Sequence, residues 1–237
     1  MRARSLLVLG FCTACVSALG RAEDWPQFRG TSGTGLTSER NLPDEWGPSK
    51  NVQWKVTIPG AAWSSPIVWG DKVFVTMAIT DNQKKPQPQP SSGPTRLNPE
   101  LEKPPDAVYR WKVFCLDRST GKVLWEALAL EAKPRIPTHP DNTYASETPV
   151  TDGECVYAYF GMTGLFCYDL AGKLLWRKDL GYYRVNGPGW GTGSSPVLLG
   201  DRLFVLCDND EKSFLGRKSV FRKSVFSCVS PARGPRS

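Results

Sequence analysis

Two loops hold the side chains of this sequence that are best suited to binding or catalysis. They read RIPTHPDNTYASETP (135–149) and GYYRVNGPGWGTGSSP (181–196). The polar and aromatic candidates in them are His139, Asn142, Tyr144, Glu147 and Trp190. A histidine can act as a general base near neutral pH, but no Ser or Cys partner can be assigned to His139. The competing interpretation is that these side chains only order the loops.

No segment of the chain matches a common cofactor-binding motif. The segment STGK (119–122) lacks the upstream Gly and the downstream Ser or Thr of a phosphate-binding loop. GPGWGTG (187–193) has Gly at every second position, which does not fit the dinucleotide-binding pattern. His139 is the only histidine, and no CxxC pair occurs after residue 22, so no metal site is expected. We expect the cysteines of the folded region to be buried thiols in strands.

A hairpin pattern that repeats along the chain positions both loops. SSPIVWGDKVFVT (64–76), ETPVTDGECVYAY (147–159) and SSPVLLGDRLFVL (194–206) align without gaps. Each copy predicts a strand, a tight turn with Gly followed by an acid, and a second strand. A second unit, FCLDRSTGKVLWE (114–126), recurs as FCYDLAGKLLWRK (166–178) and ends each time in a strand with Trp.

Four strands therefore form one unit, and the last two hairpins start 47 residues apart. Four antiparallel strands in about 40–50 residues are typical of a β-propeller blade. The first and second hairpins are further apart because of a Pro-rich segment (79–107), which we interpret as a loop inserted between two strands. NVQWKVTIPG (51–60) resembles a last strand alone and predicts the end of a further blade.

The net charge of +7 is concentrated at the two ends of the chain. Residues 1–22 hold three Arg, and residues 216–237 hold six Lys or Arg, with no acid in either segment. The body, residues 23–215, holds 21 basic and 23 acidic residues and is nearly neutral. A basic patch that binds nucleic acid is therefore not expected in the body.

The first 22 residues have the pattern of a secretory signal peptide. A short basic start precedes an apolar stretch (Leu6–Leu19), and Gly20 and Ala22 occupy the small-residue positions before the cleavage site. The stretch is short for a membrane span. Cys15 leaves a lipoprotein signal as an alternative, although the residues before it lack the usual leading Leu. We expect an exported protein, periplasmic or extracellular, with no membrane span.

The repeated Trp unit resembles the tryptophan docking repeat of the pyrroloquinoline-quinone (PQQ)-type β-propellers. The matching residues are Asp117, Gly121 and Trp125 in one copy and Asp169, Gly172 and Trp176 in the other. With the opening DWPQFRGTSGTG (24–35), the pattern is similar to an exported bacterial subgroup of PQQ-like repeat proteins. The resemblance implies that each Trp packs between adjacent blades. It also implies a ring of seven or eight blades, of which this chain holds two and part of a third.

The third copy changes character after residue 215. GRKSVFRKSVFSCVSPARGPRS (216–237) contains a direct repeat and lacks the Asp and Trp that the pattern requires. We interpret it as an aberrant basic tail, disordered, that follows loss of the reading frame. The alternative is a genuine tail that binds a membrane or nucleic acid.

The resemblance implies a non-catalytic binding or scaffolding role, like that of the periplasmic propeller that assists outer-membrane protein assembly. The partner would be a protein or a small ligand at the propeller face. The alternative is a fragment of a PQQ-dependent dehydrogenase, for which PQQ and calcium are implied cofactors. Such enzymes add a neighbouring Cys-Cys pair and acidic calcium ligands. The chain has no Cys-Cys pair, and no calcium ligand can be assigned.

Overall fold

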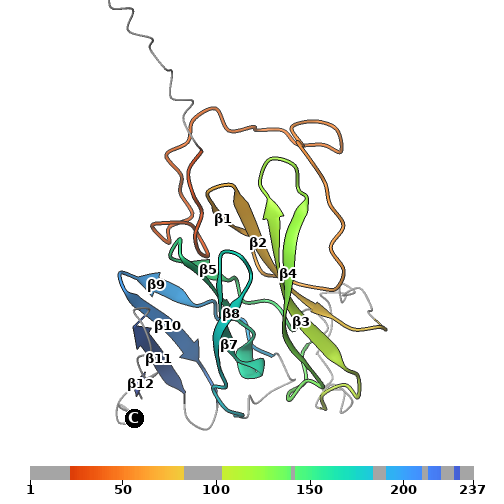
Figure 1. Cartoon of the computed structure of the whole chain (residues 1–237), viewed down its shortest axis with the longest axis vertical. Coiled ribbons are helices and arrows are strands. Elements are labelled where there is room, and N and C mark those ends of the chain that lie inside the picture. The colour runs from red at the N-terminus through yellow and green to blue at the C-terminus, as the bar shows by residue number, and fades with distance from the viewer. Residues whose placement is uncertain are drawn as a thin grey trace, which may run out of the picture.

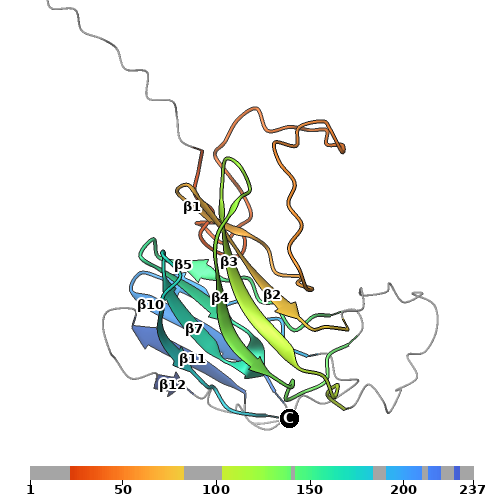
Figure 2. The same ribbon diagram turned by 45° about the vertical axis from the view of Figure 1, so that its right-hand side comes forward.

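Three four-stranded antiparallel sheets make up the fold in a computed structural model of the chain. The structure describes residues 22–82, 103–139, 142–183, 191–209, 213–219 and 227–229. The sheets lie side by side, with the second sheet between the first and the third (Figures 1 and 2). In each sheet, neighbouring strands are consecutive in the chain. The prediction of an all-β, partial propeller made of four-stranded blades is confirmed.

The strands follow the repeat in the sequence. The first sheet contains β1 (Ile67–Trp69), β2 (Lys72–Ile79), β3 (Tyr109–Asp117) and β4 (Val123–Ala132). The second sheet contains β5 (Val150–Thr151), β6 (Cys155–Tyr159), β7 (Leu165–Asp169) and β8 (Leu174–Lys178), with a short 3-10 helix at Gly161–Thr163. The third sheet contains β9 (Val197–Leu199), β10 (Arg202–Cys207), β11 (Phe214–Ser219) and β12 (Ser227–Val229). Each predicted turn of Gly and an acid joins the first two strands of a sheet.

The third sheet extends beyond the predicted end of the repeat. The predicted boundary at residue 215 falls inside β11, which pairs with β10 from Phe214 to Ser219. β12 then pairs with β11 over three residues. The tail prediction placed residues 216–237 outside the sheets, whereas 216–219 and 227–229 form strands because backbone pairing on an open sheet edge needs no particular side chain. The other tail residues lie outside the described part, and the frame-loss interpretation stays a prediction.

The predicted insertion also lies at a strand connection. β2 ends at Ile79 and β3 begins at Tyr109, and residues 83–102 between them lie outside the described part. β2 and β3 pair continuously, from Lys72 opposite Asp117 to Ile79 opposite Arg110. The ladder of the first sheet is therefore intact on both sides of the connection.

Each sheet packs one face on the next, and the two interfaces form the core. The first interface contains Ile67, Phe74, Val113 and Cys115 of the first sheet and Val156, Ala158, Phe166 and Tyr168 of the second. The second interface contains Val150, Tyr157, Tyr159 and Cys167 of the second sheet and Leu203, Val205 and Cys207 of the third. Cys115, Cys167 and Cys207 are buried as thiols rather than disulfides, as expected, and Cys155 is half-buried. Burial raises the pKa of Cys115 to about 12.

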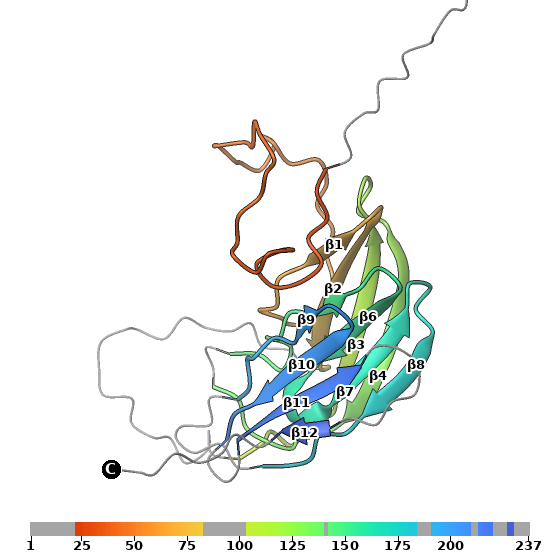
Figure 3. The same cartoon turned by 90° about the vertical axis from the view of Figure 1, so that its left-hand side faces the viewer.

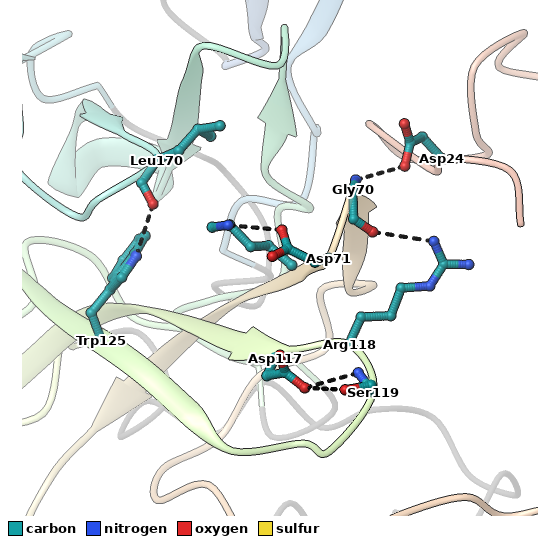
Figure 4. A network of polar contacts seen from close by, with 9 residues as sticks. Asp24, Gly70, Asp71, Asp117, Arg118, Ser119, Trp125 and Leu170 are labelled. Carbon is teal, nitrogen blue, oxygen red and sulfur yellow. Dashed lines mark hydrogen bonds and ion pairs between the residues drawn. The ribbon is translucent and has the colours of Figure 1, made fainter. Parts of the chain in front are cut away.

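Trp125 joins the first sheet to the second in the way that the docking repeat implies. Its indole N–H donates to the Leu170 carbonyl at 3.0 Å (Figure 4). A Cβ at Gly172 would lie 2.7 Å from the indole ring, so the turn can approach the ring only because residue 172 is glycine. The indole therefore packs directly on the turn between β7 and β8.

Trp54 makes the equivalent contact with the first sheet, on the turn between β3 and β4. Its indole N–H donates to the Arg118 carbonyl at 2.8 Å, and a Cβ at Gly121 would lie 2.5 Å from its ring. Trp54, Val56 and Ile58 pack on the first sheet, while Lys55 and Thr57 are exposed. The structure assigns no strand to residues 51–58, but this alternation and the docked indole match the position that the sequence predicts for the last strand of a further blade.

The turns under both indoles are held by an aspartate. Asp117 Oδ1 accepts a hydrogen bond from Ser119 N–H at 3.0 Å (Figure 4). It also accepts one from Thr120 N–H at 2.8 Å. The Ser119 and Thr120 hydroxyls also donate to it, and these bonds lower the pKa of Asp117 to about 2. In the next turn Asp169 Oδ1 accepts from the backbone N–H groups of Ala171 and Lys173. The Asp of the repeat therefore shapes the turn that receives the Trp.

Residues 24–27, which we call the strap, cross the first strands of all three sheets (Figure 1). The contacts are Gly70 N–H to Asp24 Oδ1 at 2.7 Å, two backbone bonds between Trp25 and Val68 at 2.8 and 2.9 Å, Thr151 N–H to the Pro26 carbonyl at 2.9 Å, and Leu198 N–H to Gln27 Oε1 at 3.2 Å. Four consecutive residues thus bind β1, β5 and β9 in turn. The strap holds three blades together at the turn end of their first strands.

Candidate functional site

The two loops with the candidate residues connect one sheet to the next, and they meet. Asn142 Nδ2 in the first loop donates to the Thr192 carbonyl in the second at 3.3 Å. Asn142 Oδ1 accepts from Thr143 N–H at 2.8 Å and from the Ser146 hydroxyl, which shapes its own loop. The structure therefore brings four of the five predicted residues to this end of the sheets. Trp190 lies outside the described residues.

Tyr144 and His139 are packed into the loop and make hydrogen bonds that hold it. The Tyr144 hydroxyl donates to the Ile136 carbonyl at 2.8 Å, and Trp111 Nε1 donates to the Tyr144 carbonyl at 2.8 Å. The Tyr144 ring packs edge-on against Tyr109, with ring centroids 5.0 Å apart. Burial raises the pKa of Tyr144, so the phenol stays protonated. His139 is buried, and its carbonyl accepts Asn142 N–H at 2.8 Å.

Glu147 is the most unusual of the predicted residues. It occupies the first position of the hairpin pattern, where the other two copies have Ser64 and Ser194. Its side chain is buried, and its Oε1 has no hydrogen-bond partner among the described residues. Burial raises the pKa of Glu147 to about 7, although a hydrogen bond from the Thr192 side chain acts in the opposite direction. Glu147 can therefore change its charge near neutral pH.

Two tyrosines interact with this carboxyl group, and one of them contacts a cysteine between the second and third sheets. The Tyr159 hydroxyl lies 3.4 Å from Cys207 Sγ. The pKa values of Tyr159 and Tyr183 are raised, first by burial and in part by the charge of Glu147. Tyr159, Tyr183 and Cys207 were not among the residues predicted from the sequence. Tyr159 and Cys207 lie at strand positions that usually hold core residues, and no motif distinguishes them.

A small pocket opens beside this cluster, lined by Thr138, Thr143, Met162, Gly191 and Thr192 among others. The volume open to the centre of a water molecule is about 10 Å³, which is about the space that one buried water needs. The Thr138 hydroxyl is buried there and has no partner in the described structure. The pocket therefore suits a water molecule that satisfies Thr138, and it is far smaller than a pocket for a drug-sized ligand.

A chain of hydrogen bonds crosses the sheets at the hairpin starts. Ser65 N–H donates to the Thr148 hydroxyl at 3.0 Å, and Thr148 N–H donates to the Ser195 hydroxyl at 3.0 Å. The three residues occupy the same position in the three hairpin copies. The sequence signal for this contact was present, because the second residue of SSP, ETP and SSP has a hydroxyl in every copy. Its role is to fix adjacent blades in register.

Residues 110–216 match a family model of PQQ repeats whose description reads outer membrane protein assembly factor BamB. These residues are thus similar to PQQ repeats. The matched segment contains both Trp units, including Trp125 and Trp176, so the repeat that builds the interfaces is also the part that the family model matches. No curated protein matches the chain.

Solved structures similar to this chain include BamB from Moraxella catarrhalis, with 13% identity and a TM-score of 0.40. That match covers 71% of this chain and 36% of BamB. A europium-containing methanol dehydrogenase matches with 12% identity and a TM-score of 0.40, over 72% of this chain and 25% of the enzyme. A quinohemoprotein alcohol dehydrogenase from Pseudomonas putida matches with 12% identity and a TM-score of 0.38, over 70% and 20%. The chain thus spans at most about a third of these proteins.

The described loop end of the sheets does not fit PQQ and calcium. Glu147 is the one buried carboxyl group at the loop end, and no group of three or more His, Cys, Asp or Glu side chains that could hold a metal occurs in the described ranges. The pocket beside it has space for about one water molecule. No described helix is long and apolar enough to cross a membrane.

Proposed function

We propose that this chain is an exported, non-catalytic PQQ-like repeat protein that binds a protein partner through the outward face of its third sheet. That face is formed by Val197, Phe204, Leu206 and Leu215. Phe204 lies opposite Val197 in the β9–β10 ladder, and Leu206 lies opposite Leu215 in the β10–β11 ladder, so the four side chains share one side of the sheet. The third sheet lies at the end of the row of sheets (Figure 3).

The observation that carries this proposal is a comparison between equivalent positions. Ile67 and Val150 are 0% exposed because the next sheet covers them, whereas Val197, in the same repeat position, is 49% exposed. Leu206 is 46% exposed, while its counterparts, Thr76 and Tyr159, are exposed by 1% or less. The repeat therefore places apolar side chains on a face that is covered in both other copies, and such a patch favours protein binding.

The loop end of the sheets supports a non-catalytic role. Asn142 and Tyr144 use their polar atoms to hold the loops, and the adjacent pocket has space for about one water. The family description names outer-membrane protein assembly, which suggests an unfolded outer-membrane protein as the partner class. The proposal places the protein in the periplasm or outside the cell, where it would meet such a partner.

A binding titration with a charge placed on the open face tests this function. A urea-unfolded, fluorescently labelled outer-membrane β-barrel protein is diluted into the full-length chain, and anisotropy reports binding. We expect Leu206→Lys to weaken binding about tenfold or more, because a residue at the centre of an interface is worth about 2 kcal/mol when it is lost. Leu128→Lys is the matched control, since Leu128 is 48% exposed but lies on the outer strand β4.

Two results would contradict the proposal. Equal binding by the wild type and Leu206→Lys would show that the third sheet does not form the binding face. A saturable, calcium-dependent change in Trp fluorescence on adding PQQ would instead support the alternative, a piece of a PQQ-dependent dehydrogenase. The proposed function predicts no saturable change in that second titration.

A further inference from the structure

The backbone at Glu23 is held by a carboxylate. Glu23 N–H donates to Glu39 Oε1 at 2.6 Å. In return, Glu23 Oε2 accepts from the Thr37 hydroxyl at 2.5 Å and from Ser38 N–H at 3.3 Å. Residue 23 is half-buried, although it lies next to an exposed Ala22. Three hydrogen bonds therefore close residues 23–39 into a loop at one point of the chain.

The residues directly after Glu23 form the strap. Asp24 to Gln27 bind β1, β5 and β9 in turn, as described above. On the other side of Glu23, Arg118 Nη1 donates to the Ala22 carbonyl at 3.4 Å. The same Arg118 atom also donates to the Gly70 carbonyl at 3.3 Å (Figure 4). Glu23 thus lies directly before the strap.

We propose that the Ala22–Glu23 peptide bond is the processing site of the leader and that Glu39 binds the new terminal ammonium of Glu23. The inference rests on the export proposed above. Hydrolysis adds one water across the bond, which leaves the carboxylate on Ala22 and the ammonium on Glu23. The Ala22 carboxylate departs with the leader, and Arg118 keeps its bond to Gly70.

Cleavage would strengthen the hydrogen bond between residue 23 and the Glu39 carboxylate, because the donor becomes charged. Before cleavage, Glu23 offers one neutral amide N–H to the carboxylate. After cleavage it offers a charged ammonium with up to three donors, and a hydrogen bond between two charged groups is roughly twice as strong as a neutral one. Processing therefore strengthens the contact at the start of the strap. The sequence agrees, because Gly20 and Ala22 are the small residues that leader cleavage requires.

The first test determines the mature terminus. The full-length chain with its own leader is expressed in a bacterium, and the exported protein is characterised by intact mass and N-terminal sequencing. We expect the mature chain to begin at Glu23. An exported chain that begins at any other residue would overturn the inference while leaving the proposed export intact. A chain that stays inside the cell with residues 1–22 attached would overturn both.

The second test measures the terminal ammonium itself. The mature protein is acylated at pH 7 with a limiting amine-reactive ester, and the rate at the α-amino group is read by mass spectrometry. A carboxylate partner favours the charged, unreactive form of an amine. We expect acylation to be about two- to fivefold slower than in Glu39→Gln, which is the range that an exposed ion pair supports.

Glu45→Gln provides the control for this measurement. Glu45 is an exposed carboxylate of the same segment, but it pairs with Lys50. We expect its acylation rate to equal that of the wild type. An equal rate in Glu39→Gln and in the wild type would overturn the assignment of Glu39, even with the mature terminus at Glu23.

Discussion

Gly172→Ala should destabilise the chain by about 2–4 kcal/mol, which combines backbone strain with a steric clash. Gly172 has a φ of +88°, where a side chain is strained, and a Cβ would lie 2.7 Å from the Trp125 ring. The indole cannot move away without losing its bond to the Leu170 carbonyl. The loss should appear as a lower midpoint in urea unfolding, followed by far-UV circular dichroism.

Gly181→Ala separates the effect of backbone strain from that of the steric clash. Gly181 has a φ of +95°, but no atom lies within 4 Å of the position where its Cβ would be. We therefore expect only the strain, about 1–2 kcal/mol. If both variants lose the same stability, the close packing of Trp125 on the turn contributes nothing and this part of the account fails.

The double variant Trp125→Ala/Gly172→Ala tests the contact directly. Trp125→Ala alone should cost about 2–4 kcal/mol, toward the lower part of the range for large aromatic residues because the indole is only half-buried. Without the indole, the alanine at 172 meets no ring, so its additional cost should fall to the strain alone. Simple additivity of the two losses would show that the residues do not interact.

The second large effect is a pH dependence caused by Glu147. Its pKa is raised to about 7 in the folded chain, against an ordinary value of 4.5, because the side chain is buried. Between these values the folded state binds more protons than the unfolded state, so stability falls as the pH rises. The stabilising contribution of Glu147 to the free energy of unfolding is fully present below pH 4.5. It is lost as the pH rises through 7. We expect about 2–3 kcal/mol to be lost between pH 5 and pH 8.

Glu147→Gln should remove this loss, since glutamine does not titrate. The measurement is the difference in unfolding free energy between pH 5 and pH 8, compared between the variant and the wild type. Glu154→Gln is the control, because Glu154 is an exposed carboxylate in the same hairpin. A wild type and a Glu147→Gln variant with the same pH dependence would show that Glu147 is ionised in the folded chain.

The repeat could be predicted because its physical requirements are local. A turn needs glycine where φ is positive, and Gly70, Gly153 and Gly200 provide it at the same place in each hairpin. The resemblance to the tryptophan docking repeat implied the contact of Trp125 with the next sheet, and the likeness of residues 51–60 to a last strand predicted the position of Trp54. These signals lie within about a dozen residues, so one sequence is enough to recognise them.

The strap and the buried cluster depend on contacts between distant residues. Gln27 meets Leu198, and Tyr159 meets Cys207, with long stretches of chain between the partners in each pair. No periodicity marks such pairs, because each depends on how the sheets are placed against one another. Glu147 was selected as a polar loop residue, but its burial follows only from the packing of the third sheet on the second.

The open face of the third sheet is the central claim, and carbene footprinting in solution tests it most directly. The full-length chain is labelled briefly, and modification is quantified at equivalent positions in the three sheets. The account predicts strong labelling of Val197 and Leu206 and weak labelling of Ile67, Val150 and Tyr159. Equally weak labelling at Val197 and Ile67 would contradict the account, because it would show that the third sheet is already covered.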